Sequence, residues 1–273
     1  MNYLKKGFLA LSLISAAVLL SGCGLKKSPA ASSVPQAEPT STPARSIAET
    51  ISKRPFVSLT PTADGHWVNL EIKNLIKGTT GINYDLVYLA DFEGSKIERG
   101  VSTGGVPIDL NGADEYQKKI LFGSASCTTG TCKYKYDENV TEGSLNLNLV
   151  GGLGEKYEVS YRIQRGSEGK QGLTTGDGLF SFVSSALSAK SLYLTISTIG
   201  IPTALPAGVV PKSEPYGLFP AITAKGIVSF KTDLTSAVIY ASDGKSWRKL
   251  ETKIANGVAS AEASGVSYFI LAE

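Results

Sequence analysis

The sequence predicts an all-β protein made of two tandem β-sandwich domains. From Phe56 onward, hydrophobic residues recur at every second position, which is the period of a strand with two different faces. Short runs rich in Val, Ile, Leu and Tyr are separated by Gly, Asp and Asn turns, at a spacing of about 8 to 12 residues. No segment has the 3.6-residue period over the length of a long helix. Together these patterns favour sandwiches over helical or mixed folds.

The first expected domain spans residues 55–166 and holds about seven strands. In residues 66–75, Val68, Leu70 and Ile72 alternate with polar positions and are suited to a core. Gly100 opens a glycine-rich segment, residues 100–105, that we expect to be a flexible loop because no helix follows it to hold a phosphate. The other expected strands are residues 82–91, 119–124, 132–136, 144–150 and 156–164.

A Gly- and Ser-rich interval, residues 166–178, marks the expected boundary, and the second domain spans residues 177–273. Asp243-Gly244 and Asn256-Gly257 are dipeptides suited to tight hairpin turns. We expect a short turn of helix after residue 183. The expected strands are residues 179–183, 191–197, 226–231, 237–241, 247–250, 257–261 and 267–271.

The last 60 or so residues resemble the end of an immunoglobulin-like or fibronectin-III-like module of secreted bacterial proteins. The resemblance is carried by the pattern Tyr216-Gly-Leu-Phe219, by residues 239–244 with Trp247, and by the closing residues 267–271. It covers under a quarter of the chain. It implies a fold and says little about activity.

The first residues have the layout of a secretory signal, with Lys5 and Lys6 before an apolar run at residues 8–20. This run has 13 residues, whereas a helix needs about 20 to span a bilayer. The following Leu20-Ser21-Gly22-Cys23 resembles the lipobox of bacterial lipoproteins. The resemblance implies that residues 1–22 are removed and that Cys23 carries lipid, diacylglycerol and an acyl chain such as palmitate. The protein would then be anchored to the cell membrane or outer membrane and face the extracytoplasmic space.

Residues 23–54 are predicted to be a disordered, lipid-anchored linker rich in Pro, Ser, Ala and Thr. Large apolar residues are nearly absent there, so the segment buries too little surface to offset its ordering entropy.

The charge distribution argues against nucleic acid as a partner. Without Lys5 and Lys6, 25 basic residues stand against 24 acidic ones, and the basic residues are scattered. We therefore expect no nucleic-acid binding.

Cys127 and Cys132 flank Thr-Thr-Gly-Thr, in which Gly130 can supply a turn that brings the two cysteines together. We predict a disulfide that fixes a loop tip between two strands, and free thiols are the alternative. The spacing is not Cys-x-x-Cys, and two thiols with one His do not make a zinc site. No metal and no cofactor are expected.

Nothing in the sequence forms a recognisable catalytic set. His66 is the only histidine, follows Asp64-Gly65, and is expected to be a solvated turn residue. No Gly-x-Ser-x-Gly motif occurs, so a serine triad is disfavoured. Acidic loop residues, expected to be solvated turns rather than calcium ligands, are Asp109, Asp114, Glu115, Asp137 and Glu138.

Aromatic residues are the best remaining indication of a binding site, because Trp and Tyr rings stack on sugars and anchor protein interfaces. The candidates for a ligand-facing position are Trp67, Tyr134, Tyr136 and Trp247. The alternative is that they fill the core or form cross-strand pairs that stabilise a sheet.

These observations predict a non-enzymatic, lipid-anchored envelope protein that binds a protein or glycan or supports the surface. Its partners would be the membrane, through the lipid on Cys23, and an envelope protein or glycan. One alternative is a hydrolase of cell-wall or extracellular polymer that uses a carboxylate pair, which the many acidic residues leave open. Another is a solute-binding lipoprotein, although that class typically has an α/β fold, which this chain lacks.

Overall fold

The computed structural model describes residues 51–273. The leader, Cys23 and residues 23–50 of the predicted linker lie outside the described residues. Residues 51–273 contain 20 strands and only two short 3-10 helices, η1 (Ile51–Lys53) and η2 (Gly166–Lys170). The all-β prediction is therefore confirmed. Within this range there is no helix with the length and hydropathy that crossing a membrane requires.

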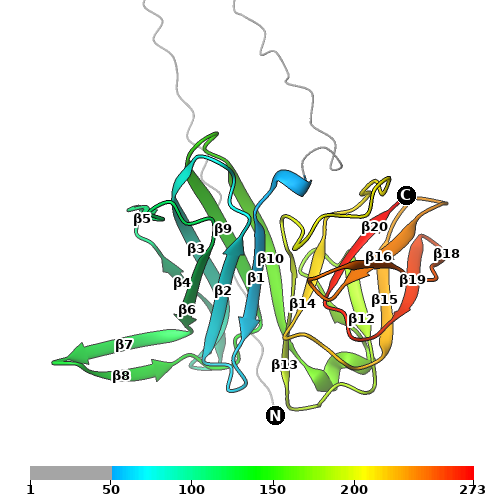
Figure 1. Ribbon diagram of the computed structural model, residues 1–273. Helices are drawn as coiled ribbons and strands as arrows, with labels where there is room; N and C mark the ends of the chain where they lie inside the picture. The colour runs from blue at the N-terminus through cyan, green and yellow to red at the C-terminus, as the bar shows by residue number, and fades with distance from the viewer. Residues whose placement is uncertain (1–50) are drawn as a thin grey trace, which may run out of the picture. The chain divides into compact units, whose positions relative to one another are not determined.

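Four sheets are present, and all strand pairs in them are antiparallel. The three-stranded sheet has the order β1-β2-β6, and the two-stranded sheet is the hairpin β7–β8 (Figure 1). These strands are β1 (Phe56–Pro61), β2 (Trp67–Lys73), β6 (Tyr116–Leu121), β7 (Gly123–Thr128) and β8 (Thr131–Tyr136).

The ten-stranded sheet has the order β17-β16-β20-β14-β13-β10-β9-β3-β4, with β5 paired to β3. Its strands are β3 (Thr79–Phe92), β4 (Ser95–Ser102), β5 (Ile108–Asp109), β9 (Glu142–Gly151), β10 (Lys156–Arg165), β13 (Leu192–Ser197), β14 (Tyr216–Phe219), β16 (Val238–Ser242), β17 (Trp247–Lys249) and β20 (Tyr268–Ala272). The five-stranded sheet has the order β11-β12-β15-β19-β18. It consists of β11 (Leu173–Thr174), β12 (Phe180–Val183), β15 (Gly226–Lys231), β18 (Lys253–Ala255) and β19 (Val258–Ala263).

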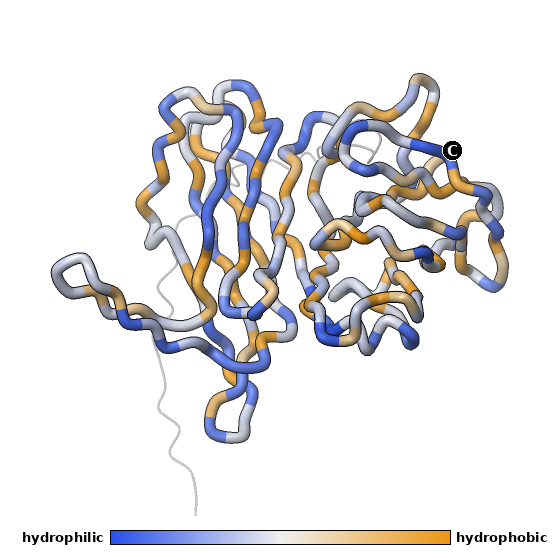
Figure 2. The backbone as a smooth tube through the Cα atoms, turned by 60° about the horizontal axis from the view of Figure 1, so that its bottom comes forward, coloured by the Kyte–Doolittle hydropathy of each residue, from blue (hydrophilic) through white to orange (hydrophobic). Residues whose placement is uncertain are grey.

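Two hydrophobic cores form between these layers. In the first, the three-stranded sheet packs on β3, β9 and β10, with Leu70, Leu86 and Leu147 fully buried. In the second, the five-stranded sheet packs on β14, β16 and β20, with Phe182 and Phe269 fully buried. The alternation of hydrophobic and hydrophilic residues along the strands, seen in Figure 2, is what allows one face of each strand to enter a core.

One sheet serves both cores. Strand β10 pairs with β13, so the ten-stranded sheet continues from the first core into the second. On β13, Leu194 and Ile196 enter the first core, whereas Tyr193 enters the second. The interval predicted as a domain boundary, residues 166–178, carries η2 and β11 and leads the chain from one core to the other.

Several local predictions need correction. Gly100 lies within β4, and the segment predicted as a loop begins as an edge strand that pairs with β3. Ile51 is buried and Arg54 pairs with Glu214, so the folded part begins before the predicted end of the linker at residue 54. The short helical turn expected after residue 183 is absent from the described chain, which bends there instead.

Candidate binding site

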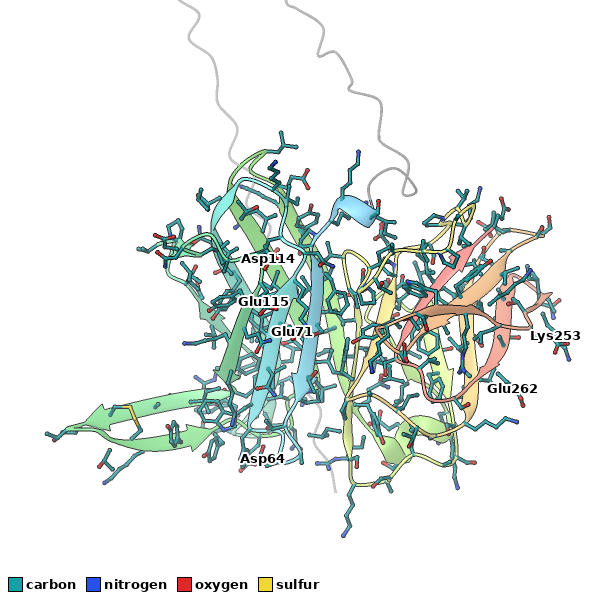
Figure 3. The ribbon with its side chains drawn as sticks, viewed as in Figure 1. Asp64, Glu71, Asp114, Glu115, Lys253 and Glu262 are labelled. Carbon is teal, nitrogen blue, oxygen red and sulfur yellow. A yellow bond between two sulfur atoms is a disulfide. The ribbon has the colours of Figure 1, made fainter. Side chains whose placement is uncertain are left out.

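The hairpin β7–β8 is closed by a tight turn and a disulfide. Thr129 and Gly130 have φ values of 49° and 82°, and two positive φ values in a two-residue loop characterise a type I′ turn. Cys127 and Cys132 are direct cross-strand partners and form a disulfide, which confirms the prediction (Figure 3). The pair fixes the tip of a two-stranded arm that projects beyond the end of β6 (Figure 1).

Strand alternation gives this arm two different sides. Tyr134 and Tyr136 lie on one side with their rings stacked, 6.0 Å between centroids and 11° between planes. Their cross-strand partners are Ala125 and Gly123, which are too small to cover the rings. Lys133 and Lys135 alternate with the tyrosines and therefore lie on the opposite side. The tyrosines remain 45% and 38% exposed.

His66, which immediately precedes β2, and Trp67, the first residue of β2, hold the base of the arm. The His66 ring stacks on Tyr136 at 3.8 Å between centroids, and Trp67 meets Tyr134 edge to face at 5.4 Å. We call the four rings of His66, Trp67, Tyr134 and Tyr136 the aromatic platform. Lys119, on the neighbouring strand β6, places its ammonium group 4.9 Å from the centre of the Trp67 ring. A cation at that distance is attracted to the ring face.

A buried network holds the same base from the other side. The Gly123 N–H donates to the Tyr88 hydroxyl at 3.0 Å, and that hydroxyl donates to the Asp137 carboxylate at 2.8 Å. Arg99 pairs with Asp137 at 3.2 Å, and the Asp137 side chain is only 7% exposed. Asp137 is thus not the solvated turn residue that the sequence suggests. Burial, followed by the bond to Asp137, raises the pKa of Tyr88 above its ordinary value.

Next to the platform, the outer side of the three-stranded sheet is polar. Cross-strand register aligns Thr60 with Asn69 and Lys119, and Ser58 with Glu71 and Gln117. The Gln117 amide donates to Glu71 at 2.9 Å, and Lys73 pairs with Glu71 at 2.9 Å. All of these side chains except Lys73 line a shallow hollow of about 440 Å³. Glu71 is marked in Figure 3. We call this surface the polar face: Ser58, Thr60, Asn69, Glu71, Gln117 and Lys119.

A second hollow of about 440 Å³ is also walled by His66 and Tyr136. Its polar lining comes from Asp64, Asp137, Glu138, Asn139 and Arg165. Asp64 lies in the turn before β2 (Figure 3). The Thr62 hydroxyl and the backbone N–H of His66 donate to Asp64 and lower the pKa of its carboxyl group. Polar groups thus lie on two flanks of the platform.

The structure brings three of the four predicted aromatic residues together and separates the fourth. Trp247 is only 9% exposed, and its indole N–H donates to the Thr203 carbonyl at 2.9 Å. It packs with Ile51, Ile201 and Ile270 in a third cluster. The expectation that Trp247 faces a ligand is therefore corrected. Its burial follows from a loop distant in sequence, which strand alternation alone does not reveal.

Sequence reasoning missed His66 and Lys119 as parts of the site. His66 immediately precedes Trp67, so its position beside a predicted aromatic residue was a usable signal. Lys119 carried no such signal, because its contact with Trp67 depends on the register between β2 and β6.

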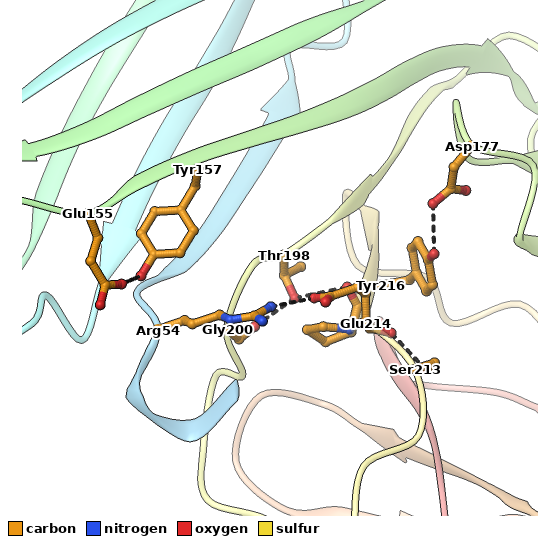
Figure 4. Close-up of polar contacts among 10 residues, drawn as sticks. Arg54, Glu155, Tyr157, Asp177, Thr198, Gly200, Ser213, Glu214 and Tyr216 are labelled. Atoms are coloured by element: carbon orange, nitrogen blue, oxygen red, sulfur yellow. Dashed lines mark hydrogen bonds and ion pairs between the residues drawn. The ribbon is translucent and has the colours of Figure 1, made fainter. Parts of the chain in front are cut away.

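A third hollow, of about 360 Å³, is lined by three carboxylates: Glu158 of β10, Asp177 between β11 and β12, and Glu214 just before β14. Glu214 pairs with Arg54 at 2.7 Å, and Asp177 accepts the Tyr216 hydroxyl at 2.7 Å (Figure 4). Glu214 and Asp177 are thus engaged by neighbouring side chains. Across residues 51–273, no group of three or more His, Cys, Asp or Glu side chains is arranged to hold a metal ion.

Comparisons of the chain with protein-family models, with curated proteins and with solved structures gave no match.

Proposed function

We propose that this protein is a lipid-anchored, extracytoplasmic envelope protein that binds a glycan through the aromatic platform and catalyses no reaction. The observation that carries the proposal is the row of contacting rings in which Tyr134 and Tyr136 are exposed and His66 and Trp67 are half-buried. The anchor part of the proposal rests on the lipobox Leu20-Ser21-Gly22-Cys23. The immunoglobulin-like character of the two halves stays a prediction from the sequence.

The chemistry around the rings favours a glycan over a protein partner. Sugar rings present apolar C–H faces that pack on aromatic rings, and hydroxyl groups that both donate and accept hydrogen bonds. The polar face offers carboxylate, amide, hydroxyl and ammonium groups from Glu71, Asn69, Gln117, Thr60 and Lys119 beside the platform. The centre of a protein–protein interface is instead depleted of charged residues.

Catalysis is not part of the proposal. In the third hollow, Glu214 is engaged by Arg54 and Asp177 by Tyr216. Beside the platform, Asp64 accepts hydrogen bonds from Thr62 and from the His66 backbone. A hydrolase that uses two carboxyl groups needs one of them to be protonated as an acid, and the pKa of Asp64 is shifted in the opposite direction.

Intrinsic fluorescence can test glycan binding directly, because the chain has only two tryptophans. In a Trp247→Phe background, the tryptophan emission, excited selectively over the tyrosines, comes from Trp67 alone. Titration with cell-wall and capsular oligosaccharides is expected to shift that emission. Tyr134→Ala is expected to weaken binding at least about tenfold, which corresponds to a loss of about 1.4 kcal/mol.

Two matched controls separate a specific effect from a general one. Leu153→Ala removes an exposed apolar side chain, 76% accessible, that lies outside the platform. Lys133→Ala changes the same strand on its opposite side. Neither is expected to alter binding. If the oligosaccharides leave Trp67 emission unchanged while an envelope protein shifts it, the glycan proposal is wrong and a protein partner takes its place.

The anchor has its own test. Wild-type protein expressed in a bacterium is expected to incorporate labelled palmitate and to fractionate with membranes. Cys23→Ala is expected to lose the label. Labelling that persists in Cys23→Ala contradicts the assignment of Cys23.

A further inference from the structure

Strand β7 is an unprotected sheet edge. The edge strands β4, β6, β8, β17 and β18 all carry Lys or Arg, and the two-residue edge strand β5 carries Asp109. Charged side chains on an edge discourage pairing with another chain. The uncharged edge strands β1 and β11 are covered: Val57 of β1 donates to the Thr198 carbonyl, and the Thr174 carbonyl of β11 accepts the Thr195 hydroxyl. Strand β7 reads Gly-Ser-Ala-Ser-Cys-Thr, has no charge, and is exposed from Ser124 to Thr128.

The hydrogen-bonding groups on this edge can be assigned by alternation. The Asp137 N–H donates to the Phe122 carbonyl across the hairpin, just beyond β7 and β8, whereas the Phe122 N–H donates to the His66 carbonyl. The next pair, Gly123 with Tyr136, therefore directs its backbone groups away from the hairpin, as the bond from the Gly123 N–H to Tyr88 shows. By the same alternation, the N–H and C=O groups of Ala125 and Cys127 point outward. Among the described residues they have no hydrogen-bond partner there.

We propose that two copies of the protein pair through β7, in antiparallel orientation and centred on Ala125. Ala125 would then exchange two hydrogen bonds with Ala125 of the second copy. The Cys127 N–H of each copy would donate to the Gly123 carbonyl of the other copy. The Gly123 N–H takes no part in the contact and keeps its bond to Tyr88. The result is a four-stranded sheet with the order β8-β7-β7-β8.

A second copy suits this edge better than another occupant for two reasons. An isologous contact places each strand against itself, and β7 brings no charge to repel its copy, unlike β8 with Lys133 and Lys135. Antiparallel pairing also places the base of one arm against the tip of the other. The bodies that carry the two arms then lie at opposite ends of the new sheet.

The pairing adds a consequence that rests on the proposed function. The twofold axis of an antiparallel pair is perpendicular to the sheet, so the same side of both hairpins faces the same way. Tyr134 and Tyr136 of both copies would lie on the same face of the new sheet, on its two outer strands, with the small side chains of the two β7 strands between them. Once a glycan polymer has bound one platform, its binding to the second platform is intramolecular. The polymer would therefore bind the dimer more tightly than it binds the monomer.

The pairing itself is tested without any glycan. The experiment uses residues 44–273, which include all of the described residues 51–273, with the disulfide intact. Sedimentation velocity is expected to show a monomer–dimer equilibrium over concentrations up to about 1 mM, the range of a small interface. Amide exchange is expected to slow at Ala125 and Cys127 as concentration rises, and not at Ser124 or Ser126.

Two variants and a control locate the contact. Ala125→Pro removes an outward N–H without removing a bond of the hairpin ladder, and Ala125→Lys places two ammonium groups opposite each other. Each is expected to weaken dimerisation at least about tenfold. Thr131→Lys puts the same charge on β8, away from the contact, and is expected to have little effect.

Three outcomes would overturn the proposal. The first is that the protein stays monomeric at about 1 mM, where even millimolar affinity is visible. The second is that a dimer forms but Ala125→Lys does not weaken it, which would place the contact elsewhere. The third is that the protein stays monomeric while an unrelated extended peptide protects the amides of Ala125 and Cys127, which would make β7 a docking strand for another protein. A dimer without glycan binding would support the pairing and reject only the proposed function.

Discussion

The rings of His66 and Tyr136 lie nearly parallel, with 3.8 Å between their centroids and 5° between their planes. His66 immediately precedes β2, and Tyr136 is the last residue of β8. The stack therefore joins the base of the projecting arm to the sandwich that carries it. The orientation of the aromatic platform depends on this contact and on the bond between Gly123 and Tyr88.

His66→Ala is expected to loosen the arm while leaving both cores intact. A stacked aromatic pair contributes about 0.5 to 1.5 kcal/mol beyond its buried area. Amide exchange in residues 123–136 is expected to accelerate, whereas exchange in β9 stays unchanged. His66→Phe keeps a flat ring and serves as the control. Equal protection of the arm in His66→Ala and wild type would show that the stack does not hold it.

Removal of the disulfide is expected to act locally. The two cysteines are five positions apart, so their bond restricts a short loop and stabilises the fold by at most about 2 kcal/mol. In Cys127→Ser/Cys132→Ser, the tip of the arm is expected to lose amide protection, and the free energy of global unfolding is expected to fall by no more than that amount. A larger loss in urea denaturation would mean that the arm contributes to a core.

Thr129→Asn is expected to stabilise the hairpin. Thr129 is β-branched and adopts a φ of 49°, in the left-handed region that Asn tolerates far better. The resulting Asn-Gly pair is a favoured type I′ turn, and we expect a gain of about 1 kcal/mol. Exchange rates at the tip would measure it. Gly130→Ala, at a φ of 82°, is expected to have the opposite effect.

Gly143→Ala is expected to destabilise the ten-stranded sheet by about 3 kcal/mol or more. A Cβ atom at Gly143 would collide with the Val87 carbonyl and lie 2.8 Å from the Tyr161 hydroxyl. Gly100→Ala is a matched control in the same sheet, because its Cβ would lie 3.4 Å from the nearest atom, the Leu86 carbonyl oxygen. Urea denaturation of both variants tests this; equal stability would show that β9 shifts at little cost.

The free energy of unfolding is expected to fall as pH rises above about 10, the ordinary pKa of tyrosine. Burial raises the pKa of Tyr161, and burial followed by a bond to Asp177 raises the pKa of Tyr216. The unfolded chain then releases these protons before the folded one does, so stability is complete below pH 10 and is lost above it. The slope is at most about 1.4 kcal/mol per pH unit for each tyrosine.

Urea denaturation between pH 9 and about pH 11.5 measures this slope. Tyr216→Phe removes one of the buried hydroxyl groups and is expected to make the slope shallower. If wild-type stability stays constant across this range, the tyrosines ionise in the folded state and their raised pKa values are contradicted.

Local pattern was enough to predict much of the fold. Strand β15 has the predicted bounds, and β2, β9 and β10 lie within two residues of theirs, because their residues alternate sharply. The strands that were not predicted are β1, β4, β5, β11, β14 and β18. The burial pattern shows why for two of them: β14 is buried at all four residues, and β1 at five of six, so neither alternates.

Long-range register decides what the sequence could not predict. The disulfide lies within six residues, and its turn was predictable. The platform instead depends on how β2, β6 and β8 lie beside one another, and the pairing of β10 with β13 depends on the whole fold. Trp247 was misassigned for the same reason, since the Thr203 carbonyl that its indole contacts lies 44 positions away.

Adjacent residues of β13, Tyr193 and Leu194, pack into different cores. Each half of the folded chain thus completes its interior with a strand that the other half also needs. A cut at residues 166–178, where the sequence suggests a join, would leave residues 55–166 without Leu194 and Ile196 and with an open edge at β10. We therefore expect that neither half folds alone as a module that recombination could move to another protein.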